Sequence, residues 1–186
     1  MNMYMHFSYE NIFENVIYKI GQYGPIILII LSFFFLWNYE NLFFYYTIGV
    51  FINSILNIII KGFLQQPRPS EDPKEFELAL KNGKRFIFKD GMIPHDIFGM
   101  PSGHTQSALF SSFYIFLSLR KINILLFYLI ISLIVIYQRI KYNYHTFFQT
   151  LVGAIIGILF SYYIYWLSMC KIQGKLSEKQ DDFAKV

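Results

Sequence analysis

Long uncharged stretches dominate the chain. Five stretches contain no Asp, Glu, Lys or Arg: Ile20–Tyr39, Asn41–Ile60, Ile97–Leu119, Ile122–Gln138 and Tyr142–Cys170. The hydrocarbon core of a bilayer is crossed by about 20 apolar helical residues, with a range of about 17 to 25. The pattern therefore predicts an all-α fold, a polytopic membrane helix bundle with about five transmembrane helices. We expect these helices near residues 23–39, 42–60, 102–119, 122–138 and 148–169.

The two ends of the chain differ from this membrane region. Up to the first residue of the first uncharged stretch, Ile12, Val16 and Ile20 recur at helical spacing, with Glu14 and Lys19 between them. Such a segment is an interfacial helix on the bilayer surface or an ordinary helix packed on the bundle. The predicted organisation is an N-terminal amphipathic segment (1–22), a membrane domain (23–170) and a solvated C-terminal tail (171–186) that mixes Lys with acidic residues.

One polar loop, residues 61–100, interrupts the membrane pattern. Between Lys61 and Asp96 lie 13 of the 28 charged residues. Residues 73–82 predict a short amphipathic helix, and the alternating segment 84–89 between Asn-Gly and Asp-Gly pairs predicts a hairpin or edge strand. Loops of this length are often lids or binding loops, although a tolerated insertion is the alternative. We expect Asp96 to be a loop charge, with a supporting role beside a site as the alternative.

Composition supports the membrane class. Hydrophobic residues make up 55% of the chain and charged residues 15%, against about 25% charged in a typical soluble domain. The net charge of +4 is not packed into a basic arm, so the expected partner is a lipid bilayer and not a nucleic acid. The single cysteine, Cys170, excludes an intramolecular disulfide framework and a multi-cysteine zinc site. No oligomeric state is predicted.

Unusual polar residues stand at the ends of the predicted helices. They follow the second helix, open the third, end the fourth and precede the fifth: Lys61 and Arg68, Pro101-Ser102-Gly103-His104, Arg139, and His145. Because consecutive spans alternate in direction, all of these positions fall on one face of the membrane. Taken singly, a cation beyond a membrane helix is usually a snorkelling anchor, and a lone histidine is usually a packed or capping residue. The prediction of a shared site rests on their combination.

These residue types suit phosphoryl chemistry. Arginine offers planar, bidentate donors to phosphate oxygens, while lysine acts as a point charge. A helix N-terminus favours an anion, and a glycine there lets the backbone approach closely. One imidazole could attack phosphorus while a second protonates the leaving oxygen.

The order and spacing of these residues resemble the phosphatidic acid phosphatase type 2 superfamily. Its signature is Lys, six residues, Arg-Pro; then Pro-Ser-Gly-His; then Ser-Arg, five residues, His, three residues, Asp. The first two motifs match fully, but the third has Gln138 for Ser and Gln149 for Asp. The segments 144–149 (YHTFFQ) and 100–106 (MPSGHTQ) are similar to the dolichyl-diphosphatase branch, which usually has Gln in place of the Asp.

The resemblance implies a role for each motif residue. His145 would be the nucleophile that forms a phosphohistidine, His104 the general acid, and Gln149 the residue that orients His145. The phosphate-binding residues would be Lys61, Arg68, Ser102, Gly103 and Arg139. No metal and no other cofactor is expected, since three cations would do the work of a metal ion.

The expected function is therefore that of an integral-membrane, metal-independent lipid phosphatase. By resemblance, it would hydrolyse a polyprenyl (dolichyl-type) diphosphate to the monophosphate and phosphate. Phosphatidic acid or another lipid monophosphate is the alternative substrate. A catalytically impaired lipid-phosphate-binding protein and a structural or channel-like membrane protein are alternatives of other classes.

Two smaller expectations concern orientation and packing. The Arg120-Lys121 loop and the basic tail favour a cytoplasmic C-terminus, which places the site on the lumenal or external face, in an endoplasmic-reticulum-type membrane if the source is eukaryotic. Gly153 and Gly157 form a GxxxG pattern, which we interpret as close packing within the chain and not as a dimer face.

Overall fold

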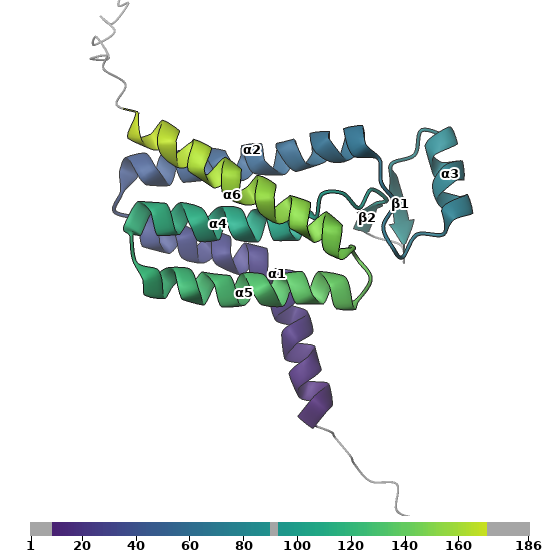
Figure 1. Cartoon of the computed structure of the whole chain (residues 1–186), viewed down its shortest axis with the longest axis horizontal. Coiled ribbons are helices and arrows are strands. Elements are labelled where there is room, and N and C mark those ends of the chain that lie inside the picture. Colours follow the sequence, from purple (N-terminus) through teal and green to yellow (C-terminus); the bar gives the residue numbers. More distant parts are fainter. Residues whose placement is uncertain (1–8, 90–92, 171–186) are drawn as a thin grey trace, which may run out of the picture.

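The computed structural model describes residues 9–89 and 93–170 as a helix bundle with a small folded loop at one end (Figure 1). The predicted all-α membrane bundle is confirmed, and the predicted tail 171–186 lies outside the described residues. In chain order the elements are α1 (Tyr9–Leu36), α2 (Glu40–Leu64), α3 (Pro73–Lys81), β1 (Phe86–Lys89), β2 (Ile93–Asp96), α4 (Gly103–Leu119), α5 (Ile122–Lys141) and α6 (Phe147–Met169).

In the described part of the chain, four helices are long and apolar enough to cross a membrane: α1, α2, α5 and α6. The remaining predicted span, α4, has 17 residues. It contacts each of the other four long helices and buries most of its side chains. Large apolar side chains such as Phe34, Phe51 and Phe63 point outward, as expected where the surrounding medium is lipid. The bundle therefore has a central helix, α4, enclosed by longer apolar ones.

The N-terminal region differs from the prediction of a helix that begins at residue 23. Residues 9–36 form one continuous helix, with Pro25 inside it. Proline lacks an N–H and its ring clashes with the carbonyl four residues earlier, so inside a helix it produces a kink or a break. Here the helix continues through Pro25. In Figure 1 the N-terminal part of α1 leaves the bundle at an angle to the rest of the helix.

Helices α4 and α6 lie in backbone contact. A side chain at Gly153 would stand 2.6 Å from the carbonyl oxygen of Ser102, and one at Gly157 would collide with the carbonyl oxygen of Gln106. The interpretation of the GxxxG pattern as intrachain packing is therefore confirmed. This contact holds the N-terminal ends of α4 and α6 next to each other.

The polar loop is folded, as the short-helix and hairpin predictions expected. Asp72 caps α3 by accepting the backbone N–H groups of Lys74 and Glu75. Strands β1 and β2 pair antiparallel, and a small core of Phe76, Ile97 and Phe98 joins the helix to the hairpin. An isolated bridge between Pro67 and Phe98 closes the loop. The loop therefore returns Asp96 and the residues after it to the end of α2.

Candidate active site

The motif residues converge at the end of the bundle next to the polar loop. His145 lies just before α6, and its Nε2 is 3.5 Å from a terminal guanidinium nitrogen of Arg68. The charges of Arg68, Arg139 and Lys61 act on both His145 and His104. The structure thus brings three cations and two imidazoles from separate segments to one place, as the helix alternation predicted.

Lys61 and Arg68 are held by the returning segment of the polar loop. The Lys61 ammonium donates to the carbonyl oxygen of Phe98 at 3.0 Å and lies 3.4 Å from the carboxylate of Asp96. The Arg68 Nε donates to the backbone carbonyl of Asp96 at 2.7 Å. Both cations are buried, so backbone carbonyls and one carboxylate offset the cost of removing them from water.

Asp96 is a partner of the site and not simply a loop charge, which corrects the first expectation. Its carboxylate accepts from Arg85 at 3.0 and 3.2 Å and from the backbone N–H of Phe98 at 3.1 Å, besides its contact with Lys61. Burial acts to raise the pKa of the Asp96 carboxyl, but the hydrogen bonds from Arg85 and the charge of Lys61 outweigh it and lower the pKa. The carboxylate therefore stays ionised beside the cations.

Hydrogen bonds fix the orientation and the tautomer of His145. Its Nδ1 lies 2.8 Å from the carbonyl oxygen of Gly99 and 3.3 Å from Oε1 of Gln149. A carbonyl can only accept, so Nδ1 carries the hydrogen, and Nε2 keeps its lone pair. Burial, with the charges of Arg68, Arg139 and Lys61, lowers the pKa of His145 to about 2. The imidazole is therefore neutral at physiological pH, with its free nitrogen facing Arg68.

Gln149 is tied into the backbone around His145. Its Nε2 donates to the carbonyl of Pro67 at 2.9 Å, and its Oε1 accepts the Thr146 N–H at 3.2 Å. The Thr146 hydroxyl in turn accepts the Gln149 N–H, which completes a capping box at the start of α6. A glutamine serves here because it must donate to one carbonyl and accept from another group, which an ionised aspartate could not do.

Arg139 lies in the last turn of α5 and has unused hydrogen-bonding capacity. Its guanidinium carbon stands 4.3 Å from the centre of the Tyr144 ring, and its NH1 contacts Gln22 and Gln138 at 3.4 and 3.3 Å. Its Nε is buried and has no hydrogen-bond partner among the described residues. A buried unpaired donor on a cation calls for an acceptor, and an oxyanion would supply one.

Ser102, Gly103 and His104 form the start of α4. The Ser102 side chain is fully buried and makes no capping bond to the helix, although its oxygen accepts from Thr105 at 3.1 Å. His104 is half-buried. It lies within hydrogen-bonding reach of the backbone of Gln22. The first turn of α4 therefore offers backbone N–H groups, and the charges of the three cations act on its imidazole.

A buried amide network beneath this turn was missed by the sequence reasoning. Asn57 donates to Oε1 of Gln106 at 2.8 Å and to the carbonyl of Pro101 at 3.3 Å. Gln106 donates to the side chain and backbone of Asn53 at 2.9 and 3.1 Å. A polar side chain in the middle of a membrane helix is energetically costly unless it has a hydrogen-bond partner. Asn53 and Asn57, which stand in an apolar run, are therefore the sequence signal for this network.

Comparison with known proteins agrees with this geometry, because the family model of the PAP2 superfamily matches residues 39–172. The chain belongs to the PAP2 superfamily. The superfamily predicted from the three motifs is therefore confirmed, and all of those motifs lie inside the matched region. Helix α1 lies outside it.

A curated relative supports the same family. The Arabidopsis thaliana protein named "Lipid phosphate phosphatase epsilon 1, chloroplastic" is 30% identical over 135 residues, which cover 67% of this chain and 41% of the relative. The chain thus spans about two fifths of that relative's length. No solved structure matches. The dolichyl-diphosphatase branch is not distinguished by these comparisons.

Proposed function

We propose that this chain is an integral-membrane lipid phosphatase that acts through a phosphohistidine on His145. The observation that carries the proposal is the state of that residue: its Nδ1–H is fixed on the Gly99 carbonyl, and its Nε2 lone pair faces the Arg68 guanidinium. A nucleophile needs a free electron pair, and the phosphoryl group it attacks needs cations around it. Membership of the PAP2 superfamily supports the same assignment.

The reaction would proceed in two displacements. First, Nε2 of His145 attacks phosphorus, a P–N bond forms, and the bond from phosphorus to the leaving oxygen breaks while His104 donates a proton to that oxygen. Second, His104 takes a proton from a water molecule, whose oxygen attacks phosphorus. The P–N bond breaks, and inorganic phosphate and neutral His145 are released.

Each phosphate-binding residue would have a distinct part. Lys61 would approach the phosphoryl oxygens from the end of α2, Arg68 from the polar loop, and Arg139 from α5 with its unpaired Nε. Ser102 would contribute its hydroxyl, because its backbone N–H already donates to the Gln149 carbonyl at 3.0 Å, and Gly103 would contribute its backbone N–H. These charges would stabilise the transition state without a metal ion. Gln149 would orient His145, together with Gly99.

The proposed substrate is a polyprenyl diphosphate, supported by the dolichyl-diphosphatase-like strings 100–106 and 144–149. The leaving group would then be a polyprenyl monophosphate. A lipid monophosphate is the second candidate, favoured by the name of the Arabidopsis relative. The Arg120-Lys121 loop lies at the opposite end of the bundle from the site, which supports a lumenal or external site.

The test is phosphate release by the purified protein in detergent, with a chelator present, from polyprenyl diphosphate, phosphatidic acid and para-nitrophenyl phosphate. His145→Ala should abolish release from every substrate. His104→Ala should lose far more with phosphatidic acid, whose alkoxide leaving group needs a proton, than with para-nitrophenyl phosphate, because a nitrophenolate leaves without one. Release by His145→Ala at the wild-type rate would overturn the assignment. Binding of lipid phosphate without turnover would instead support the impaired binding protein.

A further inference from the structure

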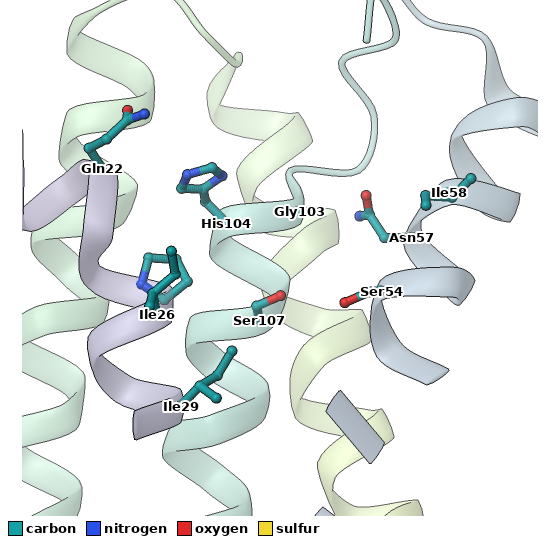
Figure 2. Close-up of a pocket in the computed structure, with 10 residues that line it drawn as sticks. Gln22, Ile26, Ile29, Ser54, Asn57, Ile58, Gly103, His104 and Ser107 are labelled. Carbon is teal, nitrogen blue, oxygen red and sulfur yellow. The ribbon is translucent and has the colours of Figure 1, made fainter. Parts of the chain in front are cut away.

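A pocket of about 350 Å³ lies beside the candidate active site, between α1, α2 and α4 (Figure 2). Its wall from α1 includes Gln22, Ile26 and Ile29, and the facing wall from α2 includes Ser54 and Ile58. Figure 2 shows the side chains of these two walls on either side of α4. The surface of the pocket is mostly apolar, with polar groups from Gln22, Ser54, Asn57, His104 and Ser107, as in small-molecule sites generally.

One end of the pocket is formed by residues of the candidate active site. Gly103 and His104, which open α4, line it directly. The charges of Arg139, Arg68 and Lys61 also act on His104. A group that leaves phosphorus after taking a proton from His104 would therefore emerge at the mouth of this pocket.

The pocket runs from the site toward the middle of the bundle. Its lining on α1 extends from Gln22 to Ile29, seven residues, which is about 10 Å at 1.5 Å per residue. Methylene groups are about the size of a water molecule, which occupies about 30 Å³, so 350 Å³ holds roughly a dozen of them. That amount is the proximal part of one hydrocarbon chain, and the remainder would lie in the bilayer.

We propose that this pocket seats the first dozen or so carbons of a single lipid chain on the leaving group, and that α1 thereby sets the chain selectivity. This inference rests on the proposed function, since it names the chain that accompanies the transferred phosphoryl group. Helix α1 lies outside the residues that match the family model. Ile26 and Ile29 are thus specificity-determining residues that belong to this chain's own N-terminal helix.

The first experiment measures kcat/KM for single-chain isoprenyl diphosphates of increasing length in detergent. Each added isoprene unit should raise kcat/KM until the pocket is full, at about 10 to 15 carbons, and longer chains should gain little. A uniform rise to much longer chains, or no dependence on length, would contradict the pocket as the chain's seat.

The second experiment narrows the pocket from its two walls separately. Ile29→Trp on α1 and Ser54→Leu on α2 should each lower the ratio of kcat/KM for a 15-carbon diphosphate to that for para-nitrophenyl phosphate by at least tenfold, the smallest effect expected from a poor fit in an apolar pocket. The matched control is Ile27→Trp, two residues earlier on α1, exposed and outside the pocket lining, which should leave the ratio unchanged.

The outcomes separate this inference from the function on which it rests. If wild-type protein releases phosphate from no substrate, the proposed phosphatase function fails. If it hydrolyses both substrates but neither pocket variant changes the ratio, the function stands and the chain pocket is refuted. An equal loss in Ile27→Trp would also refute it, because the effect would then come from bulk on α1 and not from the pocket.

Discussion

Replacing Gln149 by leucine tests how His145 is held. The substitution keeps a similar size but removes three hydrogen bonds of the side chain: to the carbonyl of Pro67, from the N–H of Thr146, and the 3.3 Å contact with Nδ1 of His145. The shorter bond from Nδ1 to the Gly99 carbonyl remains. The variant therefore separates the two groups that orient the imidazole.

The expected magnitudes follow from these bonds. A typical hydrogen bond contributes about 1 kcal/mol, and a buried group left without a partner costs about 1–3 kcal/mol. Gln149→Leu should thus lower the free energy of unfolding by about 2–4 kcal/mol. Because Gly99 still fixes the tautomer, kcat should fall by only about tenfold, equivalent to about 1.4 kcal/mol. This loss is far smaller than that expected for His145→Ala.

The assay pairs thermal unfolding in detergent with phosphate-release kinetics. Gln106→Leu is the matched control, because Gln106 is also a buried glutamine with three side-chain hydrogen bonds, all to Asn53 and Asn57. It should lose comparable stability but less kcat than Gln149→Leu. The reasoning is refuted if Gln149→Leu loses kcat as completely as His145→Ala while it remains folded, since the Gly99 carbonyl would then be insufficient.

Three further predictions concern charge, pH and packing. Arg139→Lys should weaken inhibition by orthovanadate, a phosphate mimic, by tenfold or more, because an ammonium cannot replace a bidentate guanidinium. Unchanged inhibition would exclude Arg139 from the anion site. The pKa of His145 in the folded protein lies far below 6.5, its value in the unfolded chain. Below about pH 6.5 the unfolded state therefore binds one more proton at this imidazole than the folded state does. The free energy of unfolding should fall there by up to about 1.4 kcal/mol per pH unit. His145→Gln should therefore show a smaller fall in Tm between pH 6.5 and 4.5, and identical falls would contradict a buried neutral imidazole. Gly157→Val should lower Tm by an amount corresponding to about 1–3 kcal/mol or more, because the new side chain meets the backbone of α4. An unchanged Tm would show that α4 and α6 can move apart at little energetic cost.

Much of the site could be predicted because its chemistry is carried by side chains with rigid spacing. Lys61 and Arg68 stand seven residues apart at the end of one helix. Alternation of the spans is enough to bring them to the face where Arg139 and His145 lie. The backbone acceptors could not be predicted. Every residue has a carbonyl, so nothing in the sequence singles out Gly99 as the group that holds Nδ1 of His145.

The path of α1 and the role of the polar loop were harder to predict for another reason. Glu14 and Lys19 suggested a surface segment separate from the membrane helix, but a helix can continue through both when its charged side chains are exposed, as they are here. The sequence indicates only a loop charge at Asp96, because its partners, Lys61 and Arg85, are 35 and 11 residues away. Only the fold of the loop brings them together.

The position of Asp96 has a consequence for how the bundle can assemble. Several like charges buried in one small volume repel one another, and each unpaired buried ion costs several kcal/mol. Here an ionised carboxylate from β2 contacts Lys61 and Arg85, and the carbonyl of the same residue binds Arg68. The chain therefore brings its own counter-ion, and its cationic end can be completed during biogenesis before any phosphorylated lipid arrives.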